Sequence, residues 1–204
     1  MNYRADFHAP FSFVGTDIAE ISNDNWQVGN PPKSYFQMTY VENYGFLINL
    51  YSDEKDPVME YHHAGDPAYK DSCLEFFANF DPDNSDKYMN FEFSAGGAML
   101  FGAGESRIGR TELTDFYKNA DVTVSVHEDR WDVMAFIPKE IIFSVYGELK
   151  FKPGYTFKAN VYKCCEKEGR EHFVSWSPIV SEKPDFHTPE QFGFVTLDKS
   201  IENI

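Results

Sequence analysis

The amino-acid sequence predicts an all-β fold, an antiparallel β-sandwich of two sheets with one or two short helical segments. Short stretches of alternating apolar and polar residues recur along the chain, and turns rich in Gly, Pro, Asp and Asn separate them. Aromatic residues make up 17% of the sequence and suit a pleated, half-buried surface. Because β-sandwiches of roughly 200 residues often form a single unit, residues 1–204 are expected to form one domain.

Eight segments carry the strand pattern in chain order. They are Phe46–Leu50, Ser72–Phe77, Tyr88–Ser94, Ala98–Phe101, Val122–His127, Trp131–Ile137, Thr156–Tyr162 and Phe192–Leu197. Two further segments are expected to be helical, Asp115–Asn119 and the region 137–144, where Pro138 suits the start of a helix. The many short strands and the small helical share together favour a sandwich.

Residues 71–77 and 88–94 alternate most clearly between apolar and polar side chains. Successive strand residues point to opposite faces, so each segment has one apolar and one mixed face. The residues expected in the core are Leu74, Phe76, Phe91 and Phe93. The mixed face is either an ordinary solvated sheet face or a ligand-binding face, and alternation alone favours the solvated one.

The formal net charge of −15 narrows the choice of partner. Phosphate backbones and anionic membrane surfaces bind clustered Lys and Arg, and the 18 basic residues here are scattered. Neither nucleic acid nor membrane is therefore an expected partner, whereas an uncharged ligand meets no electrostatic penalty. No apolar stretch approaches the roughly 20 residues that span a bilayer, and no secretory signal is visible. The sequence as written predicts a cytoplasmic protein, or a secreted one if a signal has been removed.

The three cysteines are Cys73, Cys164 and Cys165. Cys73 lies in a strand pattern and is expected to be a small buried apolar residue. Neighbouring Cys164 and Cys165 are a poor disulfide pair, and no Cys/His spacing matches a zinc site. The odd number of cysteines favours a reducing compartment.

Catalytic motifs are not apparent. Asp71 and Glu75 would lie roughly 13 Å apart along one strand, beyond the carboxylate spacing of glycoside hydrolases. Glu75 and Glu92 approach each other only if their strands pair, which the sequence does not show. No nucleophile elbow surrounds Ser175. The sequence therefore predicts a protein that is not an enzyme.

The segment 81–86 is dense in Asp and Asn, whose oxygens could bind calcium. It lacks the glycine and the distal glutamate of an EF-hand loop, so a hairpin turn is the simpler interpretation. No cofactor is certain, calcium is the one cation left open, and metal-ligating residues remain unknown.

Two blocks of sequence carry a recognisable pattern. The first comprises residues 71–77 and 88–93 followed by Gly96 and Gly97. The second comprises residues 159–164, 172–178, 184–189 and 192–193. Together the blocks resemble the family 9 carbohydrate-binding modules, because they occur in that family's order and span nearly the whole chain. The resemblance implies a two-sheet sandwich that binds sugar.

In the xylanase-attached members of that family, two tryptophans grip a sugar ring and a glutamate binds its hydroxyl groups. By position, the resemblance implies that Glu75 takes the role of the glutamate, while Tyr69 and Trp176 take the roles of the two tryptophans. The chain departs from the family pattern at Tyr69, and again where Phe173 stands in place of an asparagine. Those members also bind calcium, through ligands that cannot be assigned here.

Two further residues complete the expected site. Asn90 shares the mixed face of its strand with Glu92, and Arg107 follows a glycine-rich loop from which a fixed donor could reach a sugar. The expected carbohydrate-binding residues are therefore Tyr69, Glu75, Trp176, Arg107 and Asn90. The expected function is non-catalytic carbohydrate binding. The alternative is a structural or protein-interaction domain with a degraded sugar site.

Overall fold

The computed structural model describes residues 1–8, 13, 16–119 and 121–199. Its strands are β1 (Asn2–His8), β2 (Ala19–Glu20), β3 (Ser34–Val41), β4 (Gly45–Ser52), β5 (Cys73–Asn79), β6 (Tyr88–Ser94), β7 (Met99–Gly104), β8 (Thr111–Glu112), β9 (Asp121–Val126), β10 (Trp131–Pro138), β11 (Thr156–Cys165), β12 (His172–Ser175) and β13 (Gly193–Lys199). Its helical segments are η1 (Ala68–Lys70), α1 (Thr114–Asn119), α2 (Lys139–Tyr146) and η2 (Pro189–Gln191). The expected all-β class is confirmed. Among the described residues, no helix is long and apolar enough to cross a membrane.

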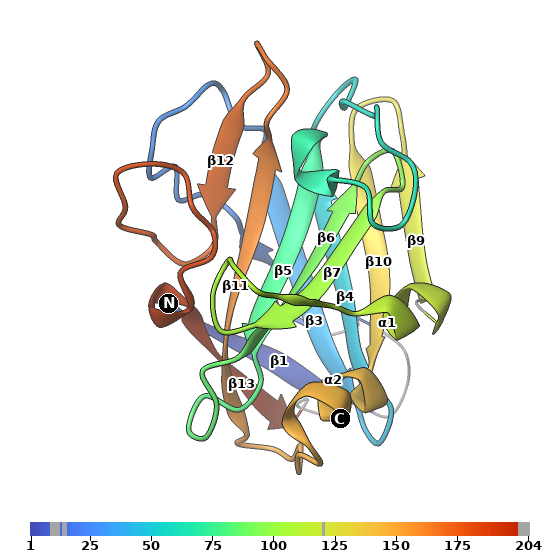
Figure 1. Cartoon of the computed structure of the whole chain (residues 1–204), viewed down its shortest axis with the longest axis vertical. Helices are drawn as coiled ribbons and strands as arrows, with labels where there is room; N and C mark the ends of the chain where they lie inside the picture. The colour runs from blue at the N-terminus through green and yellow to red at the C-terminus, as the bar shows by residue number, and fades with distance from the viewer. Residues whose placement is uncertain (9–12, 14–15, 120, 200–204) are drawn as a thin grey trace, which may run out of the picture.

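The strands form two packed layers joined by one continuous hydrogen-bonded path (Figure 1). The order is β8-β7-β6-β5-β11-β13-β1-β3-β4-β10-β9, with β12 added to β11 and β2 to β3. Most neighbours are antiparallel, as expected. The exception is β1, which pairs in parallel with both β13 and β3. Parallel pairing with β13 needs no hairpin, because the two strands belong to opposite ends of the chain.

The two layers meet through an aromatic core. Phe46 of β4 contacts Phe157 of β11 across the sandwich, with ring centroids 5.4 Å apart. On β5 and β6, Phe76 and Phe91 stack in parallel at 6.0 Å. The core residues expected from alternation, Leu74, Phe76, Phe91 and Phe93, are all buried in this cluster. Strand parity therefore assigned the inner face correctly.

The two short helices pack against the strands, α1 on β7 and α2 on β10 and β4. Phe116 of α1 is fully buried against Phe101 of β7, with ring centroids 4.8 Å apart. Helix α2 begins directly after Pro138 and ends at Tyr146. The next residue is Gly147, whose φ of 77° suits glycine and whose N–H bonds to the Phe143 carbonyl. Both helical predictions are confirmed within a few residues.

A buried ion pair joins the two layers at one end. Lys163 of β11 is fully buried and lies 3.1 Å from the carboxylate of Glu54. Trp131 of β10 donates to the same carboxylate at 2.9 Å, and Lys163 also contacts His172 of β12 at 2.8 Å. Burial by itself raises the pKa of Glu54, but Lys163 and the other donors outweigh it and lower that pKa. The pair is therefore ionised and links β11 to β10.

The mixed face of β5, β6 and β11 is covered, which corrects the expectation of a solvated face. A second apolar cluster lies on it, formed by residues such as Phe77, Tyr88 and Tyr162, together with Phe186 from the segment after β12. Tyr162 stacks on Phe186 at 4.1 Å and donates its hydroxyl to the Phe186 carbonyl. The chain between β12 and β13 thus folds back over the sheet and leaves only part of this face open.

Candidate functional site

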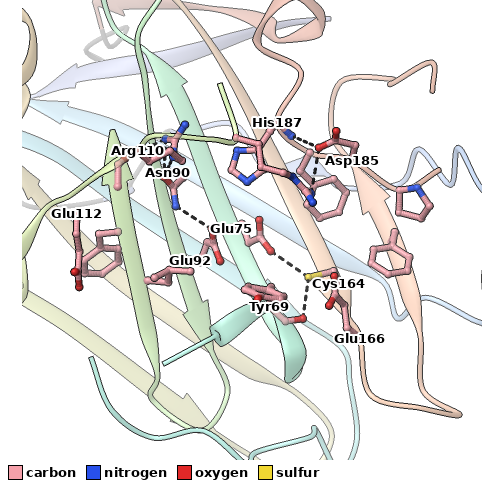
Figure 2. A pocket seen from close by; sticks show the side chains of 17 residues that line it. Tyr69, Glu75, Asn90, Glu92, Arg110, Glu112, Cys164, Glu166, Asp185 and His187 are labelled. Atoms are coloured by element: carbon pink, nitrogen blue, oxygen red, sulfur yellow. Dashed lines mark hydrogen bonds and ion pairs between the residues drawn. The ribbon is translucent and has the colours of Figure 1, made fainter. Parts of the chain in front are cut away.

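A cavity of about 600 Å³ occupies the part of this face that remains open (Figure 2). Its floor is made by β5, β6, β7 and β11, and its rim by η1, β12, the loop after β7 and the segment around residues 184–187. The volume lies within the range of roughly 300–1,000 Å³ usual for small-molecule sites. Of the five residues expected to bind sugar, the cavity brings together four, Tyr69, Glu75, Asn90 and Arg107.

Two glutamates lie side by side on the cavity floor. Glu75 of β5 and Glu92 of β6 are directly opposite each other in the paired strands, and they are 2% and 4% exposed. Directly opposite residues have Cβ atoms roughly 5 Å apart. Burial, together with neighbouring acidic groups that include Cys164 and Glu92, raises the pKa of Glu75 well above its ordinary value. Burial likewise raises the pKa of Glu92 to about 8. Burial therefore favours the protonated form of both carboxyl groups, and Glu92 is largely protonated near neutral pH.

Within the described part of the chain, each glutamate makes one side-chain hydrogen bond. Glu75 Oε1 accepts from the Cys164 thiol at 3.1 Å, and Glu92 Oε1 accepts from Asn90 Nδ2 at 2.9 Å. Among the described residues, nothing bonds to the buried Oε2 of Glu92. An unsatisfied buried polar atom costs roughly 1–3 kcal/mol, so a ligand hydroxyl group at this point would remove a penalty that the free protein carries.

Arg110 holds Asn90 in place. Its guanidinium group donates to Asn90 Oδ1 from Nε at 2.9 Å and from Nη2 at 2.6 Å, and it lies 4.1 Å from the centre of the Tyr88 ring. A Cβ atom at Gly102 would come within 2.9 Å of Asn90 Oδ1, so glycine at that position leaves room for this contact. Asn90 thus lines the cavity with its amide oxygen bound to Arg110, while its amide nitrogen orients Glu92.

Arg107 and His187 belong to the rim. Arg107 lies in the loop after β7 and forms an ion pair with Asp185 at 3.2 Å, with 63% of its side chain exposed. His187 contacts the Tyr88 hydroxyl through Nδ1 at 2.7 Å. Burial and the nearby Arg110 and Arg107 lower the pKa of His187 to about 4, so this ring is neutral. The rim therefore offers one exposed cation that already has an acidic partner.

Aromatic faces line the remaining walls. Tyr69 comes from η1, and its carbonyl lies 3.7 Å from the Cys164 sulfur. Phe173 of β12 pairs in register with the same Cys164. Both rings are half-buried and both line the cavity, near Glu75. Sugar rings pack their C–H faces against such aromatic surfaces.

The structure places Trp176 elsewhere, in the core between the two layers. Its side chain is 3% exposed and meets Phe36 edge-on at 5.5 Å and Tyr3 at 6.3 Å. The Trp176 N–H bonds to the Val161 carbonyl, which extends the β12 pairing by one residue. Because Phe173 and Trp176 are three residues apart along this extended chain, they point to opposite faces. Trp176 is therefore absent from the cavity walls, and Phe173, interpreted from sequence as a departure, supplies a ring there.

The residues that sequence reasoning missed are Phe173, Glu92, Arg110 and Cys164. The sequence contains a signal for Glu92, since alternation places it on the same face as Asn90, but its pairing with Glu75 depends on strand order. The sequence contains no such signal for Cys164, because its contact with Glu75 joins distant parts of the chain. In the segment 81–86, Asn84 Nδ2 donates to Asp81 Oδ1 within the β5–β6 turn. Within the described residues, no three Asp, Glu, His or Cys side chains of that segment converge on one point.

A profile of carbohydrate-binding family 9 matches residues 10–197. The chain is a member of carbohydrate-binding family 9. This confirms the resemblance inferred from the sequence blocks, and carbohydrate binding is the function that characterises the family. No curated protein sequence matches the chain.

Solved structures of similar fold cover nearly the whole chain. A proposed carbohydrate-binding protein from Bacteroides uniformis superimposes with a TM-score of 0.82 at 22% identity, covering 97% of this chain and 99% of its own. A family 9 carbohydrate-binding module from Caldicellulosiruptor kristjanssonii in complex with cellotriose gives a TM-score of 0.69 at 11% identity, covering 100% and 96%. The same organism's family 9 module in complex with glucose gives 0.63 at 11% identity, covering 100% and 99%. At these identities the similarity establishes the sandwich fold.

Proposed function

We propose that this protein binds a neutral carbohydrate in the cavity above Glu75 and Glu92, without catalysing its cleavage. The observation that carries the proposal is the unpartnered, buried Oε2 of Glu92 at the floor of an aromatic-walled cavity. Sugar hydroxyl groups both donate and accept hydrogen bonds, so they suit carboxyl groups that are protonated or ionised. The cellotriose and glucose bound by the Caldicellulosiruptor modules support this class of ligand.

The arrangement assigns a role to each wall. Tyr69 and Phe173 offer ring faces to the C–H surface of a sugar, while Glu75 and Glu92 meet its hydroxyl groups. Asn90 and Arg110 act as positioning residues, because their contacts hold Glu92 rather than the ligand. Arg107 supplies a donor at the rim. Its pairing with Asp185 favours a neutral ligand over an anionic one.

The burial of both carboxyl groups argues against hydrolysis. A glycoside hydrolase sets apart one protonated and one ionised carboxyl group. Here burial raises the pKa of both Glu75 and Glu92, so neither is held as an anionic nucleophile or base. A binding site needs no such division.

Isothermal titration calorimetry with glucose, cellobiose and cellotriose tests the proposal. We expect one site per chain, with affinity reduced tenfold to a hundredfold in Glu75→Ala, which removes a buried hydrogen-bonding group worth about 1–3 kcal/mol. Glu105→Ala is the matched control, since Glu105 is exposed in the same rim loop as Arg107 and does not line the cavity.

Two results would count against the proposal. If a wider panel of mono- and oligosaccharides shows no binding at millimolar concentration, the interaction-domain alternative replaces the sugar site. If incubation with a polysaccharide releases reducing sugar continuously, and Glu75→Gln abolishes the release, the protein is an enzyme.

A further inference from the structure

Three potential metal ligands converge beneath the cavity. The sulfur atoms of Cys73 and Cys164 and a carboxylate oxygen of Glu75 all lie within 4.8 Å of one another, and all three residues are buried. Cys73 and Glu75 are two residues apart on β5, so they share a face, and Cys164 is directly opposite Cys73 on β11. This cluster comes from strand pairing between distant segments, and no spacing within the sequence reveals it.

The spacing suits a tetrahedral ion. Zinc binds sulfur at about 2.3 Å and carboxylate oxygen at about 2.1 Å, which holds neighbouring ligand atoms roughly 3.5–4 Å apart. The sulfur of Cys164 already lies 3.1 Å from Glu75 Oε1. Small side-chain rotations on two hydrogen-bonded strands would therefore bring all three ligands to bonding distance.

The local charges favour a cation. Glu92 is directly opposite Glu75 in the paired strands, and the positive charge of Lys163 on β11 is paired with Glu54 on the other face. A divalent ion would displace the thiol protons and balance the negative charge of the thiolates and the carboxylate.

The site also has an open side. Glu75 and Cys164 line the cavity, while Cys73 does not. Three protein ligands with a fourth position open to a cavity form the arrangement of zinc sites that accept water or a ligand. Cys165 has no part in this cluster, because its neighbour Cys164 takes the outer face and Cys165 points inward.

We infer that Cys73, Glu75 and Cys164 form a binding site for one thiophilic divalent cation, such as Zn²⁺, at the base of the cavity. The inference does not depend on the identity of the sugar, because the ion and its ligands can be measured in the absence of carbohydrate. It assigns a chemical role to two cysteines that carbohydrate binding leaves unused.

The test is a titration of the reduced protein with Cd²⁺, a zinc substitute whose bonds to thiolates absorb in the ultraviolet. A phosphine reductant keeps the sulfurs reduced without competing as a thiol. We expect one Cd²⁺ per chain with thiolate absorption, and competition by Zn²⁺. Affinity should fall at least tenfold in Cys73→Ala and in Cys164→Ala. Glu75→Gln keeps both sulfurs, so it should retain the absorption and weaken affinity.

Cys165→Ala is the matched control, since this neighbouring buried cysteine lies outside the cluster. It should bind Cd²⁺ as the native protein does. Circular dichroism verifies that each variant is folded. The inference is wrong if the native protein shows no stoichiometric thiolate absorption, or if the absorption persists in the Cys73→Ala/Cys164→Ala double variant. Sugar titration of the metal-free protein separates this outcome from failure of the carbohydrate proposal.

Discussion

The inner and outer faces of β5, β6 and β11 are both buried, yet they are built differently. The inner face presents side chains such as Leu74 and Phe91 to a dry aromatic core. The outer face presents Glu75 and Glu92, which are nearly as buried but which have few protein partners. Buried carboxyl groups of this kind do not help a sandwich to fold. Burial alone therefore does not identify the core, and polar side chains that are buried without partners indicate a ligand site.

Replacing Trp176 should reduce stability more than any other substitution proposed, and it should leave sugar affinity almost unchanged. Trp176→Ala should lower the free energy of unfolding by about 3–5 kcal/mol, because it leaves a void beside Phe36 and Tyr3 in the core. Sugar affinity of the folded protein should stay within about twofold of native, since Trp176 does not line the cavity. Urea denaturation and calorimetry measure the two quantities. Trp176→Phe provides a milder variant if the alanine protein does not fold, and a tenfold loss of affinity in folded Trp176→Phe would return Trp176 to the site.

The second prediction concerns the cost of burying Glu92. An unfolded chain releases this carboxyl proton near pH 4.5, whereas the folded protein holds it until about pH 8. Between these values the folded state binds more protons than the unfolded state, so the stability contributed by Glu92 falls as pH rises. Glu92→Gln, which removes this titration, should be more stable than native by about 2–4 kcal/mol at pH 9. The full shift of about 3.5 pKa units would give about 5 kcal/mol at about 1.4 kcal/mol per unit, and local relaxation and water entry around the ionised group offset part of it.

At pH 4 the native protein and Glu92→Gln should be equally stable, because Glu92 is protonated in both states. Thermal or urea unfolding across this pH range measures the difference. Glu105→Gln, at an exposed loop position, serves as the control and should follow the native protein at every pH. Equal stability of Glu92→Gln and native at pH 9 would show that Glu92 is not buried as described.

The alternation of apolar and polar residues along each strand predicts the inner face well. The outer face depends on which strands are neighbours, and alternation within one strand does not show this. The strand Tyr88–Ser94 and its core residues follow from alternation with a period of two. Strand β3 is not among the segments expected from the sequence, although Phe36 and Met38 alternate there and are buried in the core. Local pattern leaves open which strands are neighbours.

The side-chain contacts at the site follow from which strands are paired. Glu75 meets Glu92, and Cys73 meets Cys164, because β5 pairs with both β6 and β11. Phe173 lines the cavity and Trp176 does not, because residues three positions apart on an extended chain point to opposite faces. The chain between β12 and β13 covers the outer face. Contacts such as the stacking of Phe186 on Tyr162 hold it there, and these contacts join distant parts of the sequence.

A smaller effect is expected at the aromatic wall. Phe173→Ala should weaken sugar binding by about 1–1.5 kcal/mol, roughly tenfold, because it removes one stacking face. Its effect on stability should be below that of Trp176→Ala, since Phe173 is only half-buried. Phe194→Ala is the control, an exposed ring on β13 that does not line the cavity. Phe173→Tyr should preserve affinity. Unchanged affinity in Phe173→Ala would show that the ring is not part of the sugar site.

The smallest effect is expected at the rim, where Arg107 and Asp185 pair at 3.2 Å. An exposed ion pair contributes about 0–1 kcal/mol, so Asp185→Asn should leave stability almost unchanged. It should, however, free Arg107 to meet an anionic ligand. Glucuronic acid should therefore gain affinity relative to glucose in Asp185→Asn by a few-fold, and the gain should shrink as salt is added. Calorimetry with the two sugars at low and high salt measures the ratio of the two affinities.

Asp185→Asn/Arg107→Gln is the matched control, because it lacks the freed cation. An equal gain in that double variant would mean that Arg107 does not contact the ligand and that the preference for neutral sugars arises deeper in the cavity, at Glu75 and Glu92.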